Sequence, residues 1–255
     1  MDKDIVALAP TKRFSNRVDN YVKYRPSYPA AMLSFFESTL GLKKEQRIAD
    51  IGSGTGLFAK PLLQQGYSVV CIEPNEDMRK AGEQQLSSYP GFISRKHTAE
   101  QTGLRSHSVD LITVAQAFHW MDPDATKKEF ARILKPGGHI VLAWNLRLHQ
   151  SPFMKAHHAL KEKYRTEATP ARSEDESTLR SFFEPAPMQV TRFENNQRLT
   201  FEELKGQLLS ASYIPLPGHP QYEEMIAALA ELFVTHNQQG FVTMEHETKL
   251  YWNGH

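Results

Sequence analysis

Three glycines at alternating positions, Gly52, Gly54 and Gly56, follow the apolar run 48–51. Glycine allows positive φ angles and leaves no Cβ atom in the way of a bound group. A helix that begins after such a turn directs free backbone N–H groups toward the same place. The pattern is therefore typical of a site for a nucleoside cofactor. Glu73 ends the next apolar run, where its carboxylate could accept hydrogen bonds from both ribose hydroxyls.

Two details near the glycines distinguish between cofactor classes. A dinucleotide site usually has the spacing G-x-G-x-x-G/A. Here the spacing is G-x-G-x-G, and Leu57 occupies the place of the third small residue. Asp50 precedes the first glycine by two residues; its carboxylate would repel a pyrophosphate but attract a sulfonium and an ammonium group. Together with Glu73, these features favour S-adenosylmethionine, and a nicotinamide-dependent oxidoreductase remains an alternative.

The elements that must position these residues follow from apolar runs that alternate with helical patterns, which is typical of a parallel sheet with crossover helices. The expected strands of the first half are 47–51, 68–72, 92–96, 109–114 and 139–144. The expected helices are 30–40, 56–65, 75–87 and 123–134. Asn75 is expected to cap its helix, Gly66 and the turn 135–138 to stop theirs, and Pro61 to kink the second helix slightly.

The second half has a different pattern. Helices are expected over 151–164, 201–210 and 221–237, a polar loop over 169–176, and strands over 188–199 and 241–252. These two late strands could pair with each other at one edge of the sheet.

Composition excludes several classes of function. The chain has 255 residues with 30 basic and 29 acidic side chains, so its formal charge of +1 does not suggest a nucleic-acid partner. The single cysteine, Cys71, excludes an internal disulfide and a cysteine-based zinc site, and its apolar surroundings predict a buried thiol. No signal-like or membrane-spanning apolar segment is present, which favours a soluble cytoplasmic protein.

Several segments carry a family resemblance. Besides residues 50–56 and Glu73, they are residues 98–100, 110–120 and 134–138, together with the N-terminal Tyr-x-x-Tyr-Arg-Pro-x-Tyr-Pro pattern over 21–29. With these segments the chain resembles class I S-adenosylmethionine-dependent methyltransferases. Within them it is similar to the small-molecule branch of trans-aconitate methyltransferase-like proteins, of methyltransferase type 11.

The resemblance implies a Rossmann-like, doubly wound α/β fold. Its sheet has seven strands with the last strand antiparallel, and added helices form a substrate lid. The implied organisation is one methyltransferase domain over 1–255, with an N-terminal lid segment at 1–30, a cofactor-binding core at 31–150 and a helical cap with closing strands at 151–255. The implied cofactor-binding residues are Tyr21, Arg25, Asp50, Gly52, Ser53, Gly54, Gly56, Glu73, Pro74, Met78, Glu100, Ala115, Gln116 and Ala117.

Other side chains have two interpretations. His119, with a pKa suited to neutral pH, is the candidate catalytic base; alternatively His119 and Trp120 line the substrate pocket as its wall. By the resemblance, Arg25 could hold the methionine carboxylate. The pair 157–158 points in diverging directions on a helix, so solvent exposure is expected for both histidines and no metal site.

The predicted function is methyl transfer to an oxygen, carboxylate or hydroxyl, of a small molecule. Residues 115–118 lack the Asn/Asp-Pro-Pro-aromatic pattern of enzymes that methylate base nitrogens. The acceptor pocket is expected between 151–183 and 201–237, with 210–217 at its border. A non-catalytic protein that binds S-adenosylmethionine or S-adenosylhomocysteine is the alternative. Neither a metal nor a membrane is expected, and the protein would be a monomer or a homodimer.

Overall fold

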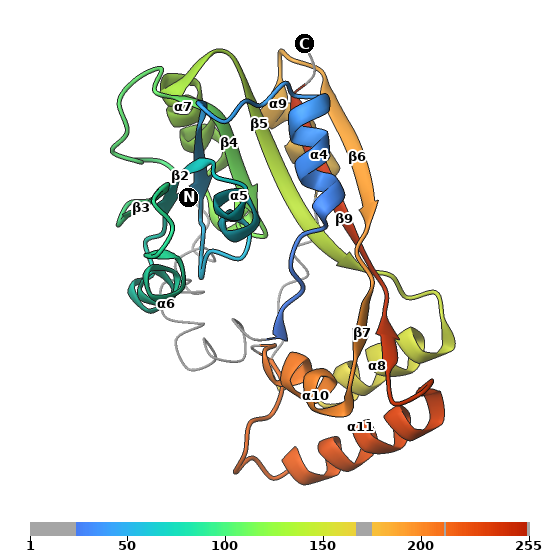
Figure 1. Cartoon of the computed structure of the whole chain (residues 1–255). Coiled ribbons are helices and arrows are strands. Elements are labelled where there is room, and N and C mark those ends of the chain that lie inside the picture. The colour runs from blue at the N-terminus through green and yellow to red at the C-terminus, as the bar shows by residue number, and fades with distance from the viewer. Residues whose placement is uncertain (1–23, 167–174, 212, 254–255) are drawn as a thin grey trace.

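The computed structural model describes residues 24–166, 175–211 and 213–253. Its main sheet has seven strands in the order β3-β2-β1-β4-β5-β9-β6 (Figure 1). The strands β1 (Arg47–Ile51), β2 (Ser68–Ile72), β3 (Phe92–Arg95), β4 (Val109–Ala115) and β5 (Leu134–Arg147) are parallel. The last strand of the chain, β9 (His246–Asn253), runs antiparallel to β5 and to β6 (Met188–Glu194). The predicted α/β fold with an antiparallel last strand is therefore confirmed, as is the pairing of the two late strands.

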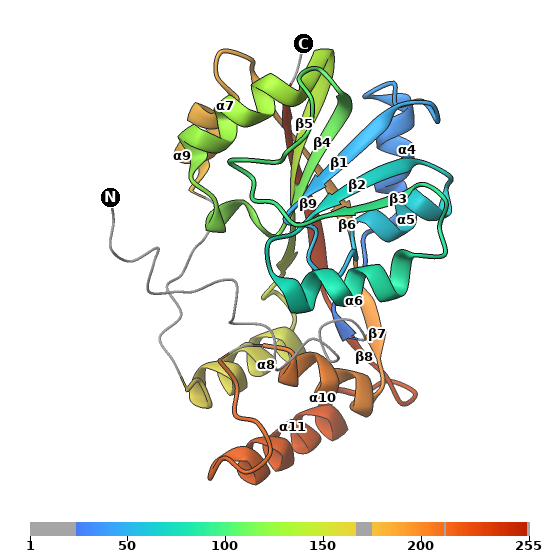
Figure 2. The ribbon, with the colours of Figure 1, turned by 90° about the vertical axis from the view of Figure 1, so that its left-hand side faces the viewer.

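Helices cover both faces of this sheet (Figure 2). On one face α4 (Ala30–Ser38), α5 (Ala59–Gln64) and the end of α6 (Glu76–Leu86) bury apolar side chains against the strands. On the other face α7 (Pro123–Ile133) and α9 (Glu176–Phe183) pack a second apolar cluster. From β1 the strands are added toward one edge of the sheet up to β3, and from β4 they are added toward the other edge, so β1 and β4 are neighbours. Open α/β sheets bind ligands in the crevice at such a reversal of strand order.

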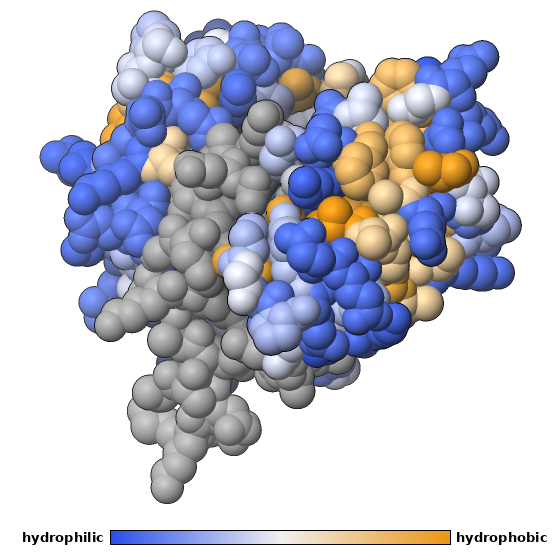
Figure 3. All heavy atoms as spheres, turned by 90° about the horizontal axis from the view of Figure 1, so that it is seen from below, coloured by the Kyte–Doolittle hydropathy of each residue, from blue (hydrophilic) through white to orange (hydrophobic). Residues whose placement is uncertain are grey.

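A third layer lies at one end of the sheet. It contains α8 (Pro152–Lys163), α10 (Phe201–Leu209), α11 (Tyr222–His236) and the antiparallel pair β7 (Gln197–Leu199) and β8 (Val242–Met244), which share a separate apolar core. Figure 3 views the molecule from below, where this layer lies, and shows hydrophobic residues gathered on the right-hand part of that face. Within the described ranges, no helix is both long and apolar enough to cross a membrane.

Several predicted boundaries were wrong, each for a local reason. Helix α5 begins at Ala59, so Pro61 lies in its first turn, where its missing N–H costs no hydrogen bond and no kink is needed. Strand β5 begins already at Leu134, because residues 135–138 form an irregularity within the strand pairing and not a separate turn. Glu176 begins α9, capped by Asp175, and is not part of a loop; residues 167–174 lie outside the described residues.

Each of the two long strands expected in the second half of the chain is replaced by two shorter strands. The expected strand 188–199 breaks at Asn195 and Asn196, which have low β propensity, and forms β6 and β7 in different sheets. The strand 241–252 likewise forms β8 and β9 on either side of Glu245. Because of these breaks, each of the two segments contributes one strand to the main sheet and one strand to the third layer, which we term the cap layer.

Candidate functional site

Two adjoining cavities open at the carboxyl ends of β1 and β4. The first has a volume of about 260 Å³ and the second about 300 Å³. Both are lined by Gly52, Gly54, Ala115, Gln116 and Trp120, so these residues form their common boundary. The predicted glycine turn and the segment after β4 are therefore brought together from positions about sixty residues apart.

The three glycines of the turn have different structural roles. All three have positive φ, +68° at Gly52, +56° at Gly54 and +82° at Gly56. A Cβ atom on Gly52 would lie 2.6 Å from the Cβ of Ala117, whereas one on Gly54 would point into open space. A Cβ on Gly56 would lie 2.3 Å from Leu86 of α6, and Gly56 lines neither of the two cavities. Gly52 and Gly54 thus shape the cavities, while Gly56 allows α6 to pack closely.

Glu73 borders the first cavity at the end of β2. Its carboxylate accepts one hydrogen bond from the N–H of Gly54 and one from the N–H of Asn75, both at 2.8 Å. Burial raises the pKa of Glu73, and these two backbone donors oppose that rise. A carboxylate has about four acceptor positions, so two remain for a ligand in the cavity.

Asp50 lies beneath the glycine turn, in the middle of the sheet. Its side chain is completely buried and lines neither cavity. The hydroxyl of Thr113 donates to Oδ1 at 2.8 Å, but Oδ2 has no protein partner. Burial raises the pKa of Asp50 to about 7. A buried carboxylate oxygen without a donor costs stability, and a cationic group bound next to the turn would compensate that cost.

The remaining wall of the first cavity comes from α6 and from the loop after β3. Pro74 and Met78 line it at the start of α6, where Asn75 caps the helix by accepting from the N–H of Met78 at 2.9 Å. Glu100 also lines the cavity, and its carboxylate accepts from the N–H of Asp122 at 3.1 Å. Predicted cofactor residues from the segments after four strands, β1, β2, β3 and β4, thus line one cavity.

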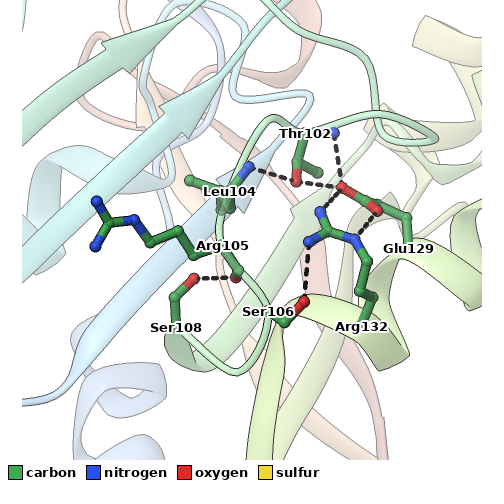
Figure 4. Close-up of polar contacts among 7 residues, drawn as sticks. All are labelled: Thr102, Leu104, Arg105, Ser106, Ser108, Glu129 and Arg132. Atoms are coloured by element: carbon green, nitrogen blue, oxygen red, sulfur yellow. Dashed lines mark hydrogen bonds and ion pairs between the residues drawn. The ribbon is translucent and has the colours of Figure 1, made fainter.

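The loop that carries Glu100 is held by α7. Figure 4 shows the carboxylate of Glu129 between Thr102 and Arg132. It accepts from the N–H of Thr102 at 2.9 Å and from its hydroxyl at 2.5 Å, and Arg132 donates to both carboxylate oxygens at 2.7 Å. Burial opposes ionisation, but these donors outweigh it and lower the pKa of Glu129 to about 2.

Glu129→Gln is expected to loosen this loop, because an amide replaces a carboxylate that accepts charge-assisted bonds worth roughly 1.5–3 kcal/mol each. We expect weaker S-adenosylmethionine binding, by about threefold to tenfold, and a lower unfolding midpoint. Folding favours the ionised form of Glu129. The difference in unfolding free energy between the wild type and the variant should therefore be largest above pH 4.5 and vanish as the pH falls toward 2. Calorimetry and thermal unfolding measure both effects. Glu231→Gln, at an exposed position of α11, is the control, and equal effects in both variants would contradict the assignment.

Gln116 has a φ angle of +57°, a backbone conformation that residues other than glycine rarely adopt. It follows β4 directly, its N–H donates to the carbonyl of Ala143, and its side chain donates to the carbonyl of Asn145 at 3.1 Å. Such strained residues cluster at functional sites. Here the strain lies at the common boundary of the two cavities.

The second cavity contains the candidate base. His119, in the 3-10 helix η2 (Phe118–Trp120), lines it together with Ser53 and Arg25. Arg25 donates to the carbonyl of Ser210 at 3.4 Å, which ties the N-terminal segment to the end of α10. Tyr28 also lines this cavity and packs edge-on against Phe58, with ring centroids 4.7 Å apart. Tyr21 lies outside the described residues.

The residues that line the second cavity and that sequence reasoning missed include Asn145, Arg147 and His246. Asn145 donates to the carbonyls of Pro26 and Ser27 at 3.3 and 3.4 Å, and so fixes the N-terminal segment over the cavity. One signal was available, since Asn145 and Arg147 follow the apolar run 140–144 at the carboxyl end of β5, where parallel strands carry site residues. No local signal marked His246.

The expected solvent exposure of the histidine pair on α8 was wrong for one residue. His158 is exposed, but His157 is only 2% exposed and faces the cap core, because adjacent helical positions point to different sides. Cys71 is buried in β2 as predicted, and burial raises its pKa. Among the residues that the structure describes, no cluster of three histidine, cysteine or acidic side chains could hold a metal.

Comparisons with known proteins find similarity to methyltransferases. Residues 49–142 match the family model described as a methyltransferase domain. The chain is 36% identical over 134 residues to an uncharacterized methyltransferase of Mycobacterium tuberculosis, and this match spans about half (52%) of each protein. It is 26% identical over 225 residues to an uncharacterized methyltransferase-like protein of Schizosaccharomyces pombe, across 88% of this chain and 87% of the relative.

Solved structures share the fold. The structure of a putative type II methyltransferase from Anaeromyxobacter dehalogenans has a TM-score of 0.67 and 22% identity, covering 90% of this chain and 97% of that one. Phosphoethanolamine N-methyltransferase 2 of Haemonchus contortus, solved in complex with S-adenosyl-L-methionine, has a TM-score of 0.56 and 14% identity, covering 99% of this chain and 60% of that one.

Proposed function

Because the chain carries a class I, Rossmann-like methyltransferase domain, we propose that the protein transfers a methyl group from S-adenosylmethionine to an oxygen of a small molecule. The observation that carries the proposal is the pair of acids on either side of the glycine turn. Glu73 borders the first cavity with free acceptor positions, and Asp50 beneath the turn has a buried oxygen without a donor. This arrangement suits a ligand with a ribose and a cationic group.

The cofactor would extend across both cavities, with different residues binding each of its parts. In the first, Glu73 would bind the ribose hydroxyls, and Pro74, Met78 and Glu100 would enclose the base. At the boundary Gly52, Ser53 and Gly54 would support the methionine portion, with Ala115, Gln116 and Ala117 opposite. Arg25 would hold the carboxylate from the second cavity. Gly56 would act indirectly, by letting α6 approach the turn.

The cofactor would supply an electrophilic methyl group, whose bond to sulfur breaks as its bond to the acceptor oxygen forms. The protein's own residues need mainly to align the acceptor and to exclude water, and such alignment contributes within a range of about 7–11 kcal/mol. Trp120 and His119 would form the wall against which the acceptor lies. A carboxylate acceptor needs no base, whereas a hydroxyl acceptor would give its proton to His119.

His119→Asn separates these two cases. With a hydroxyl acceptor we expect the rate to fall by about 10²–10⁴, the usual contribution of a general base. The histidine limb of the pH–rate profile should also disappear. With a carboxylate acceptor the rate should change little. The measurement is initial rate against pH, with His219→Asn at an exposed position as the matched control. An unchanged rate and profile with a hydroxyl substrate would remove His119 as the base.

We propose that 1–255 act as one functional domain, with 1–30 as a lid over the cofactor, 31–150 as its binding core and 151–255 as the substrate cap. The contacts of Arg25 with Ser210 and of Asn145 with Pro26 support this division. The trans-aconitate-like branch and the monomeric or homodimeric state stay predictions.

Calorimetric titration with S-adenosylmethionine and with NAD tests the proposal. Binding of the first alone is expected, and binding of NAD alone would refute it in favour of an oxidoreductase. Incubation with labelled cofactor and a panel of organic acids and phenols then tests transfer. Binding without transfer to any acceptor would favour the alternative, a non-catalytic protein that binds the cofactor or its product.

A further inference from the structure

The N-terminal segment 24–29 forms part of the wall of the second cavity without belonging to a strand. Figure 1 shows it running from the cap layer to the start of α4. Arg25, Pro26 and Tyr28 line the cavity. Pro26 and Pro29 have no backbone N–H and cannot donate a main-chain hydrogen bond. The placement of the segment therefore depends on its carbonyl groups and its side chains.

The start of the segment is held on α10. The ring of Tyr24 lies so close to Gly206 that a Cβ atom at that glycine would overlap the ring. Gln207, the next residue of α10, donates from its side-chain amide to the carbonyl of Tyr24 at 3.4 Å. Gly206 thus provides the space, and Gln207 the hydrogen bond, for docking this end of the segment on the cap layer.

The middle of the segment is held by Asn145. Its Nδ2 donates to the carbonyls of Pro26 and Ser27 at 3.3 and 3.4 Å. Its Oδ1 accepts from the hydroxyl of Thr248 at 2.6 Å and from Nδ2 of Asn195 at 3.2 Å. Asn195 also donates to the carbonyl of Ser27, at 2.8 Å. An asparagine amide has two N–H groups and two acceptor positions, and these contacts of Asn145 use all of them.

The main chain of the same residue reaches the boundary between the two cavities. The backbone carbonyl of Asn145 accepts from the side-chain amide of Gln116 at 3.1 Å. Gln116 lines both cavities, whereas the segment 24–29 lines only the second. Asn145 thus connects the segment to the residue that borders both cavities.

Packing alone does not account for asparagine at this position. Asparagine has a low β propensity, yet Asn145 lies in β5, in register with Thr248 of β9. A β-branched apolar residue would suit the strand better, but it could not donate to two carbonyls. A hydrogen-bonded amide whose positions are all used fixes one arrangement of the groups around it. The side chain of Asn145 therefore serves to place the segment.

We propose that Asn145 is a positioning residue for the cofactor: by holding the segment 24–29 it places Arg25, so that binding of the methionine portion depends on Asn145 and binding of the adenosine portion does not. The inference rests on the proposed function for the role of Arg25, which lines the second cavity. The adenosine portion would lie in the first cavity, whose lining does not include the segment. The two portions should therefore respond differently when the contacts of Asn145 are lost.

Asn145→Asp tests the proposal with a minimal change of shape. A carboxylate still accepts from Thr248 and Asn195, but it cannot donate to the carbonyls of Pro26 and Ser27 and it repels them. We expect calorimetry to show S-adenosylhomocysteine binding weakened by about tenfold or more, and adenosine binding unchanged within about twofold. A general loss of structure would weaken the binding of both ligands.

The pH dependence of this variant gives a second readout. When protonated, the introduced carboxyl group can donate to one of the two carbonyls, and its position next to them raises its pKa. The ratio of variant to wild-type affinity for S-adenosylhomocysteine should therefore recover as the pH falls from about 7.5 to about 5. The ratio removes the pH dependence that Asp50 gives to both proteins. A folding defect would not recover in this way.

Gly206→Ala is an independent variant at the other end of the segment. Alanine favours a helix more than glycine does, so α10 itself should not be weakened, but the added Cβ displaces Tyr24. This variant should likewise weaken S-adenosylhomocysteine binding and leave adenosine binding unchanged. The control is Asn237→Asp, which introduces the same charge at an exposed asparagine after α11 and should change neither affinity.

Hydrogen–deuterium exchange without ligand separates this inference from the proposed function. Peptides covering 24–29 should exchange faster in Asn145→Asp than in the wild type. If they do, and the wild type binds neither nucleoside, the proposed function fails and the positioning of the segment by Asn145 stands. Three results would each overturn the inference: wild-type affinity for S-adenosylhomocysteine in Asn145→Asp, an equal loss of affinity for both ligands, or unchanged exchange of the segment.

Discussion

Glu73→Ala is expected to weaken S-adenosylmethionine binding by more than about tenfold, equivalent to about 1.4 kcal/mol. The carboxylate borders the first cavity and also accepts the N–H groups of Gly54 and Asn75, so its removal takes away ribose contacts and leaves two donors of the turn unsatisfied. Isothermal titration calorimetry measures the change. Glu76→Ala, at a half-exposed acid of α6 that pairs with Lys80, is the matched control and should keep wild-type affinity.

Asp50→Ala should have an effect of the same size by a different route. Asp50 would act electrostatically from beneath the turn, because its carboxylate does not line either cavity. Its pKa of about 7 means that a bound cation should promote its ionisation, so binding near pH 6.5 should release a proton in the wild type and not in the variant. Titrations in buffers of different ionisation enthalpy detect that proton. Near-wild-type affinity in both the Glu73 and the Asp50 variants would contradict the cofactor assignment.

Lys161→Met is expected to stabilise the protein by roughly 1–4 kcal/mol, the range seen when buried ion pairs are replaced by hydrophobic side chains. Burial and Arg147 lower the pKa of Lys161 from its ordinary 10.5 to about 6, which means that folding disfavours the charged form. The groups that act on it are Arg147, Arg25, Arg165, Glu162 and Tyr213.

The sign of the pH dependence follows from the linkage between protonation and folding. Between pH 6 and 10.5 the unfolded chain binds a proton at Lys161 that the folded chain does not, so wild-type stability rises with pH in this window. The advantage of Lys161→Met should therefore be full below pH 6 and shrink toward pH 10. Urea unfolding at pH 6, 7.5 and 9 checks this expectation. Lys155→Met, at an exposed position of the same helix, should show no such trend, and a pH-independent or destabilising effect at Lys161 would contradict it.

Much of the fold was predictable because its signals are local. Apolar runs gave β1 and β2 with their observed ends, and Asn75 was identified as a cap from its residue type and place alone. Glycine at these three positions permits the positive φ that the turn has. Where a boundary depended on the partner strand, the prediction was wrong: β6 and β7 are separate because they pair with β9 and β8 in two different sheets.

The sequence by itself determined the glycine turn, its two neighbouring acids and the segment after β4, because each of them follows or ends an apolar run and is marked by a local pattern. Only the tertiary structure placed His157, hidden on the inner side of α8, and brought it to Arg147 and His246. Their meeting depends on how the cap helices pack against the ends of β5 and β9. Such long-range packing has no local periodicity, so no pattern in the chain could show that these scattered basic residues lie near one another.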